Sequence, residues 1–182
     1  MNGRGNPLLH LVVVVRDLCQ LRRGPQDLPY SPVLLALLIA ASILIDLASG
    51  TVISGASNVL PRSLVSTSLV LGLCWIALSI RRLGSRFVQT ASAVIACSIV
   101  ISLLAVPIVW LAGAPPASGQ PPAPLQVLLA WAMLALIVWN VAINANIVRH
   151  ALEAPFAFGV ALATAWLLAD WALGRVLFDA AG

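Results

Sequence analysis

The segment LQVLLAWAMLALIVWNVAINANIV, from Leu125 to Val148, decides the fold class of this chain. It runs for 24 residues without an ionisable side chain, and Arg149 and His150 follow it. An α-helix rises about 1.5 Å per residue, so a helix of this length can cross a hydrocarbon layer about 30 Å thick. The segment therefore predicts a transmembrane helix.

The composition of the whole chain indicates the same environment. Of the 182 residues, 61% are hydrophobic and only 9% are charged, and the mean hydropathy is +1.03. A water-soluble domain needs more polar surface than such a chain supplies. All ten basic residues are arginine, a usage typical of GC-rich bacterial genomes. The sequence therefore predicts an all-α, polytopic membrane helical bundle.

Four further apolar segments accompany Leu125–Val148. We predict five transmembrane helices, over about residues 31–49, 63–80, 87–112, 125–148 and 156–178. They form one transmembrane domain over residues 31–182, and residues 1–30 form an N-terminal cytoplasmic or interfacial segment. The residues from Gly50 to Arg62 are rich in Gly, Ser and Asn, and they form either a loop or a short re-entrant piece. The second span is the shortest, and Pro107 should kink the third near its end.

The N-terminal segment contains a short apolar run, from Leu8 to Val15. Eight residues are too few to span a bilayer, and no small-residue cleavage site follows, which disfavours a signal peptide. Polar residues then recur at i, i+4 and i+7, namely Arg16, Gln20 and Arg23. This spacing predicts an amphipathic helix in the membrane interface, ended by Gly24-Pro25. The four consecutive valines leave a short buried strand as the alternative.

The arginines set the predicted orientation. With a cytoplasmic N-terminus, eight of the ten arginines lie inside and only Arg62 and Arg175 lie outside. Cytoplasmic loops carry an excess of arginine, so we predict a multi-pass protein of the inner (plasma) membrane, with the N-terminus cytoplasmic and the C-terminus outside. The net charge of +4 favours anionic headgroups on the cytoplasmic side of the lipid bilayer. The arginines are scattered and form no basic face, so we expect no nucleic-acid partner.

Polar residues at membrane depth are the candidate functional positions: Asp46, Asn140, Asn144, Asp170 and Arg175. A charge at the centre of a span costs at least about 2.5 kcal/mol, so such residues usually face protein or water. We expect Asp46 to pair with Arg175 across helices, because pairing lowers the cost of burying both charges. Asp170 and Arg175, five residues apart, do not share a helix face. Asn140 and Asn144 lie one turn apart on one face, and they either bind a polar ligand or ion or hydrogen-bond a neighbouring helix.

Other residues of the spans indicate helix packing. Small residues recur at every fourth position and predict packing seams: Ala36 with Ala40, Gly159 with Ala163, and the series Ala161, Ala165 and Ala169. Trp139 and Trp166 lie deep in their spans and should act as packing anchors. Asn146 lies close enough to the cytoplasmic edge to contact water. Cys74 and Cys97 lie within apolar runs and should act as small hydrophobes.

Motifs of known enzymes are absent from the sequence. It contains no G-x-S-x-G, no H-E-x-x-H, no Walker-type loop and no Rossmann fingerprint. The three cysteines form no C-x-x-C pair, and His10 and His150 match no metal spacing. Asp170 stands in L-L-A-D-W and lacks the G-x-G-D of intramembrane aspartyl proteases. We therefore expect no catalytic residue, no cofactor and no metal.

The layout of the chain resembles that of the Ypt-interacting-protein (Yip) superfamily, specifically its bacterial members. The features that carry this resemblance are the five spans, the interfacial N-terminal segment and the proline-marked entry GPQDLPYSP, Gly24 to Pro32. The hydrophilic N-terminal extension of the eukaryotic members is missing, so partnership with Rab-type GTPases is not implied. The resemblance implies a non-enzymatic integral membrane protein that packs against partners or shapes membrane, and it transfers no site residues.

Two functions are compatible with the sequence. The first is a scaffold or accessory subunit whose partner is a second copy of the chain or another membrane protein. The alternative is a transport protein, either a small permease or one half of a dimeric channel, that uses Asp46, Asp170 and the Asn140/Asn144 pair. An odd number of spans allows no inverted repeat of whole halves within one chain, which favours the scaffold.

Overall fold

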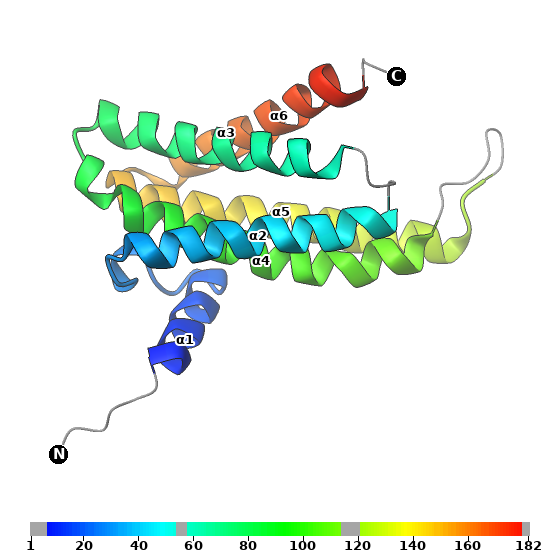
Figure 1. Cartoon of the computed structure of the whole chain (residues 1–182), viewed down its shortest axis with the longest axis horizontal. Coiled ribbons are helices and arrows are strands. Elements are labelled where there is room, and N and C mark those ends of the chain that lie inside the picture. Colours follow the sequence, from blue (N-terminus) through cyan, green and yellow to red (C-terminus); the bar gives the residue numbers. More distant parts are fainter. Residues whose placement is uncertain (1–6, 54–57, 114–120, 180–182) are drawn as a thin grey trace.

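The computed structural model describes residues 7–53, 58–113 and 121–179, which are almost entirely helical and contain no strand. Six α-helices follow one another (Figure 1): α1 (Pro7–Cys19), α2 (Pro32–Ile53), α3 (Val59–Ile80), α4 (Phe87–Ala112), α5 (Pro124–Leu152) and α6 (Phe156–Gly174). Short helical turns join or extend them: η1 (Pro25–Asp27), η2 (Gly84–Arg86) and η3 (Arg175–Asp179). The predicted all-α class is confirmed, and the strand alternative for the N-terminal segment is wrong.

The five helices α2 to α6 are long and apolar enough to cross a membrane, and each coincides with one of the five predicted spans. The bounds predicted for the loop or re-entrant piece, Gly50–Arg62, are too wide, because α2 continues to Ile53 and α3 already begins at Val59. The rest of that prediction falls on residues 54–57, outside the described residues. Pro61 is compatible with this early start, since a proline in the first helical turn removes an N–H that has no acceptor within the helix. With 22 residues, α3 is also longer than α6, which has 19.

Helix α4 is the centre of the bundle. It packs on α2, α3 and α5, and every residue from Thr90 to Cys97 is buried. A helix that is buried on all sides needs neighbours all round, and the small side chains of Ala91, Ser92 and Ala93 let those neighbours approach closely. Pro107 lies inside α4 near its end, and the helix continues to Ala112. The kink expected at Pro107 stays a prediction.

Only one of the predicted small-residue seams packs within the chain. Gly159 and Ala163 of α6 are buried, and the backbone of Ala145 in α5 lies directly against Gly159. Ala36 and Ala40 of α2 are exposed, as are Ala161 and Ala165 of α6. The prediction of seams at those positions is therefore wrong for contacts inside the chain. The reason is that spacing alone does not say which face of a helix meets its neighbour.

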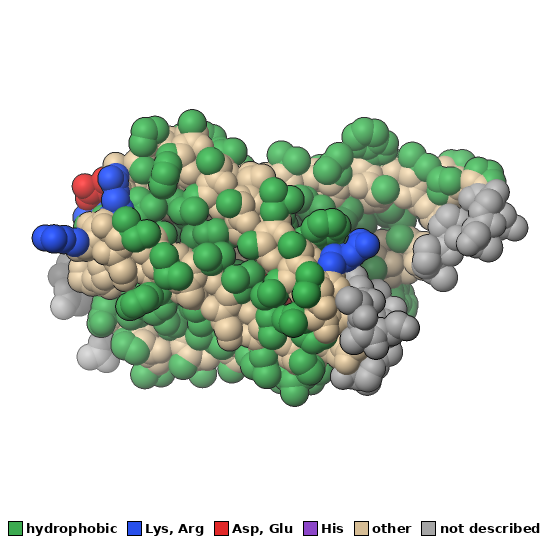
Figure 2. Space-filling view, turned by 90° about the horizontal axis from the view of Figure 1, so that it is seen from above, with side chains coloured by type: hydrophobic (Ala, Val, Ile, Leu, Met, Phe, Trp, Pro, Cys, Tyr) green, Lys and Arg blue, Asp and Glu red, His purple; other side chains and the backbone are tan. Residues whose placement is uncertain are grey.

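The surface of the five long helices is mostly apolar. Figure 2 shows hydrophobic side chains over most of the visible face, with basic and acidic atoms gathered toward one end and a separate basic group farther along. Large side chains such as Trp110, Leu128, Trp131 and Leu168 are each more than half exposed. Continuous apolar surface of this extent suits contact with lipid or with other helices.

Helix α1 slants away from the direction of the five long helices and docks on α4 and α5 (Figure 1). Its buried side chains, Val14 and Leu18, join a core cluster with Val94 of α4 and Ile143 and Ile147 of α5. Leu9 and Val12, on another face of α1, are exposed. The predicted amphipathic helix therefore forms, and it uses one apolar face to dock on the bundle. It ends at Cys19 and not at Gly24-Pro25, so Gln20 and Arg23 lie beyond it, and its position in the membrane interface stays a prediction.

Candidate functional site

The segment that follows α1 is held on the bundle through its backbone carbonyls. The indole Nε1 of Trp139 in α5 donates to the carbonyl oxygen of Cys19 over 2.9 Å. Two side-chain amides also donate to carbonyl oxygens of this segment. The first is Gln89 of α4, whose Nε2 donates to Leu28 O over 2.7 Å. The last carbonyls of a helix lack N–H donors within it, so such side-chain donors satisfy groups that burial would otherwise leave unpaired.

Asn146 is the third of these donors, and its predicted contact with water is wrong. Its side chain is buried, and Nδ2 donates to the carbonyl oxygen of Arg23 over 3.1 Å. The N-terminal segment covers this part of α5, which periodicity within α5 alone does not reveal. Asn146 therefore anchors the segment between α1 and η1.

Asp17 closes the same turn through ion pairs. Its carboxylate oxygens lie 2.9 Å from Arg16 Nη2 and 3.1 Å from Arg23 Nε. The hydrogen bond from Arg16 holds the pKa of the Asp17 carboxyl below its usual range, and the charges of Arg16, Arg23 and Arg22 act in the same direction. Asp17 thus joins the end of α1 to the chain that returns toward η1.

Two arginines of the connection between α3 and α4 cap the end of α5. Arg81 Nη2 donates to Leu152 O over 3.2 Å, and Arg86 Nη1 donates to Ala151 O over 3.4 Å. Arg86 Nη2 also lies 2.6 Å from Glu153 Oε1. A helix C-terminus exposes unpaired carbonyls at the negative end of its dipole, so guanidinium groups stabilise it. Arg81 and Arg86 therefore have a packing role at this end of the bundle.

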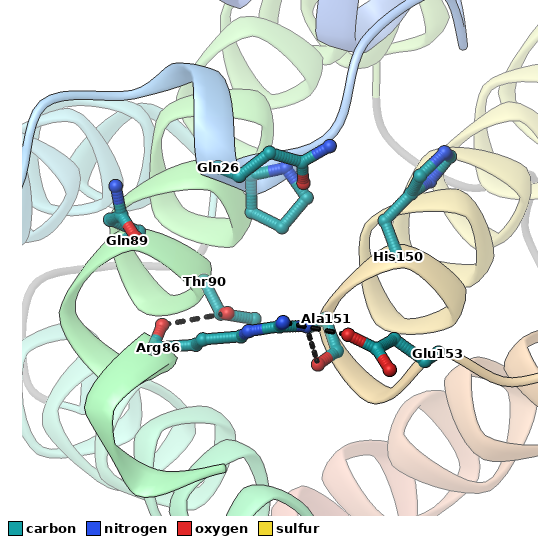
Figure 3. A pocket seen from close by; sticks show the side chains of 8 residues that line it. Gln26, Arg86, Gln89, Thr90, His150, Ala151 and Glu153 are labelled. Carbon is teal, nitrogen blue, oxygen red and sulfur yellow. Dashed lines mark hydrogen bonds and ion pairs between the residues drawn. The ribbon is translucent and has the colours of Figure 1, made fainter.

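A polar pocket of about 370 Å³ lies beside this cap (Figure 3). Arg86 extends across it from the start of α4 toward Glu153, Gln26 of η1 lies above, and Gln89 and His150 face it from α4 and α5. The ring Nδ1 of His150 lies 2.7 Å from Asn146 O, so Nδ1 carries the proton and Nε2 accepts in the neutral ring. The pocket offers donors and acceptors together, which suits a small polar group.

None of the residues of this pocket was predicted as a site residue. They come from η1 and from the facing ends of α4 and α5, far apart in the sequence, and most of them are individually ordinary polar residues near a helix end. The sequence offered two signals: the dense arginines at positions 81, 82 and 86, and the Arg149-His150 pair at the end of the fourth span. Among the described residues, no group of three His, Cys, Asp or Glu side chains lies close enough together to hold a metal ion.

The contacts described for Asp46 and Arg175 differ from the ion pair predicted between them. The Ser63 hydroxyl of α3 donates to Asp46 Oδ2 over 2.7 Å, which links α2 to α3. The guanidinium carbon of Arg175 lies 5.2 Å from the ring centroid of Trp171, one turn earlier in the chain. A nearby hydroxyl satisfies the carboxyl of Asp46 without a second charge, and the flat guanidinium stacks on an aromatic face.

Asn140 and Asn144 lie together, as their spacing predicts. Asn144 Nδ2 donates to Asn140 Oδ1 over 2.6 Å, so the two amides bond to each other along α5. Asn144 Oδ1 is buried without a hydrogen-bond partner in the part of the chain that the structure describes. Among the described residues, no hydrogen bond joins this pair to a neighbouring helix, and binding of a polar ligand or ion stays a prediction.

Asp170 lies half-exposed on α6, between the exposed side chains of Leu167 and Trp171. No hydrogen bond or ion pair to Asp170 is found among the described residues. One turn later, Gly174 lies so close to Arg62 of α3 that an added Cβ would be 3.2 Å from Nη2. The structure thus brings Arg62 to the helix face that carries Asp170, without joining the two charges.

All three cysteines are buried and free. Cys74 packs in the core cluster with Trp166, and Cys97 packs in the cluster that holds α1. The predictions that Cys74 and Cys97 act as small hydrophobes and that Trp166 is a packing anchor are confirmed. Comparison of the chain with protein-family models, with curated proteins and with solved structures found no match.

Proposed function

We propose that this chain is a non-enzymatic, multi-pass protein of a bacterial inner membrane, and that it serves as a scaffold or accessory subunit. The observation that carries this proposal is the hydrogen bond between Ser63 and Asp46, 2.7 Å long. This hydrogen bond uses the carboxyl of Asp46, a candidate transport residue, to join α2 to α3 within the same chain. Polar contacts of this kind between spans are common and stabilise bundles.

The distribution of charge supports a cytoplasmic N-terminus. Arg81, Arg82, Arg86 and Arg149 lie at the ends of α3, α4 and α5 that meet at one end of the bundle, and Arg62 lies at the opposite end of α3. An excess of arginine marks the cytoplasmic side. With five spans, we infer that the end of α6 lies outside.

The exposed face of α6 is the surface that we propose for a partner. It carries Leu167, Leu168 and Trp171 around Asp170. A carboxyl on an apolar face is costly in lipid, and contact with a helix that supplies a donor or a cation lowers this cost. The partner is a second copy of the chain or another membrane protein. The layout similar to that of the Yip superfamily agrees with a role that involves packing against partners.

The experiment compares Asp46→Asn, Asp170→Asn and, as a control outside the spans, Glu153→Gln. Protein abundance, co-purifying proteins in mild detergent, and solute or proton flux in proteoliposomes are measured for each variant. A scaffold predicts that Asp46→Asn lowers abundance and that Asp170→Asn releases a partner, whereas Glu153→Gln does neither. Loss of a flux at normal abundance in both aspartate variants would instead establish a transporter.

A further inference from the structure

An apolar groove of about 400 Å³ lies between the second half of α3 and the first half of α6. Leu73, Ile76 and Ala77 form one wall, Phe158 and Leu162 form the other, and Arg81 lies at its end. Ile76 and Phe158 are about half exposed, so the groove opens on the outer surface of the bundle. A channel of this kind suits an extended hydrocarbon chain.

Arg81 is the charged residue in the lining of this groove. One N–H of its guanidinium is used by Leu152 O, and a guanidinium carries five. Arg81 takes part in none of the ion pairs found among the described residues, in contrast to Arg86, which pairs with Glu153. A positive charge that is not neutralised therefore stands at the end of an apolar groove.

A second guanidinium lies at the same end of the bundle. Arg149, in the last turn of α5, is exposed, and its guanidinium carbon lies 5.9 Å from the centroid of the Phe156 ring at the start of α6. Stacking on a ring leaves the edge N–H groups of a guanidinium available to an oxyanion. Arg81 therefore lines the groove itself, and Arg149 lies beside Phe156, between the groove residues Pro155 and Phe158 in the chain.

We propose that the groove between α3 and α6 binds one anionic phospholipid, with an acyl chain along the apolar walls and the phosphate at Arg81. The proposal rests on the proposed membrane function and adds a ligand class to it. Charge complementarity indicates a phosphate group, because guanidinium groups bind phosphate oxygens well. The apolar groove indicates a lipid and not a free phosphate ion, because such an ion would contact only Arg81. Arg149 adds to the attraction for an anionic headgroup.

The test uses the full chain, purified and delipidated in detergent, with phosphatidylglycerol and phosphatidylcholine of identical acyl chains as probes. Retained lipid is counted by native mass spectrometry. The wild-type chain is expected to retain the anionic lipid preferentially. Arg81→Gln keeps a donor for Leu152 O and is expected to bind phosphatidylglycerol about fivefold more weakly, the factor that corresponds to roughly 1 kcal/mol for one arginine at an anionic surface. Arg82→Gln, an exposed arginine outside the groove, is the matched control and should change little.

A second variant tests the groove itself. Ala77→Phe fills it and should lower retention of both lipids, and size-exclusion chromatography shows whether the variant is still folded; if it is not, the Arg81→Gln comparison decides alone. Equal retention of both lipids by the wild-type chain, or an equal effect of Arg81→Gln and Arg82→Gln, would overturn the proposal. The proposal would also be overturned if glycerol phosphate displaced bound phosphatidylglycerol as effectively as the intact lipid does. Extraction of cell membranes at alkaline pH separates this failure from failure of the proposed function, since a membrane protein without this site still stays in the pellet.

Discussion

Gly159 of α6 lies directly against the backbone of Ala145 in α5, so that a Cβ added to Gly159 would fall about 3.2 Å from Ala145 Cα and closer still to the carbonyl oxygen. This contact lets the two helices approach at backbone distance, and α5 and α6 form the most extensive helix pair in the bundle. Small residues at such crossings are the usual means by which helices associate in membranes, where lipid provides no hydrophobic drive.

Gly159→Ala should destabilise the protein by about 1–3 kcal/mol, because a rigid backbone group blocks the new methyl. Thermal unfolding in detergent measures this loss. The matched control is Gly72→Ala in α3, where nothing lies within 4 Å of an added Cβ. That variant should be neutral or more stable by about 1 kcal/mol, the difference in helix propensity between the two residues. Equal effects of the two substitutions would show that the crossing at Ala145 is not close.

Asn146→Leu should release the N-terminal segment, because it removes the donor to Arg23 O. The carbonyl left without its partner costs about 1–3 kcal/mol. Hydrogen exchange of residues 19–28 should therefore become faster, while that of α4 stays slow. Gln20→Ala changes an exposed polar residue of the same segment and should leave the exchange unchanged.

Acidification should weaken the turn that Asp17 closes. The pKa of Asp17 is lower in the folded chain than its ordinary value of 3.8, mainly through the hydrogen bond from Arg16. A carboxyl with a lowered pKa stabilises the fold fully above the unfolded value, and the contribution is lost as the pH falls through the folded value. The protection of residues 16–23 from exchange, measured relative to the intrinsic rate at each pH, should therefore fall below about pH 4. Asp17→Asn should already exchange fast at pH 7 and show no such pH dependence.

Asp46 and Ser63 should show an energetic coupling. A double-mutant cycle with Asp46→Asn, Ser63→Ala and the combined variant isolates it, and hydrogen bonds between spans average about 0.6 kcal/mol in such cycles, with a maximum near 1.7. Unfolding in mixed micelles provides the free energies. Additive effects of the two substitutions would mean that the hydrogen bond of 2.7 Å adds nothing to the link between α2 and α3.

The sequence was sufficient for the helices because hydrophobic length and proline positions are local signals. Both ends of α4 and the start of α6 were predicted at the residues where they occur. The partners of the polar residues were not predicted. Whether Asp46 contacts Arg175 or Ser63 depends on how three helices are rotated about their axes relative to one another. Periodicity within one helix gives no information on that rotation.

The same limit explains the centre of the bundle and the burial of Asn146. The long apolar run of α5 indicated the fold class, yet its first half is largely exposed, and the most buried stretch is Thr90–Cys97 of α4. Asn146 is covered by a segment more than a hundred residues earlier in the chain. The polar pocket and the groove between α3 and α6 arise in the same way, from residues distant in sequence.

The most direct test of the account is the location of the two ends of the chain relative to the membrane. Five spans entered from the cytoplasmic side predict that a phosphatase fused after Gly182 is active and that a fluorescent protein at the same position is dark. The same fluorescent protein fused before Met1 should be bright. A bright fluorescent protein and an inactive phosphatase after Gly182, with the N-terminal fusion also bright, would place both ends in the cytoplasm and contradict the account.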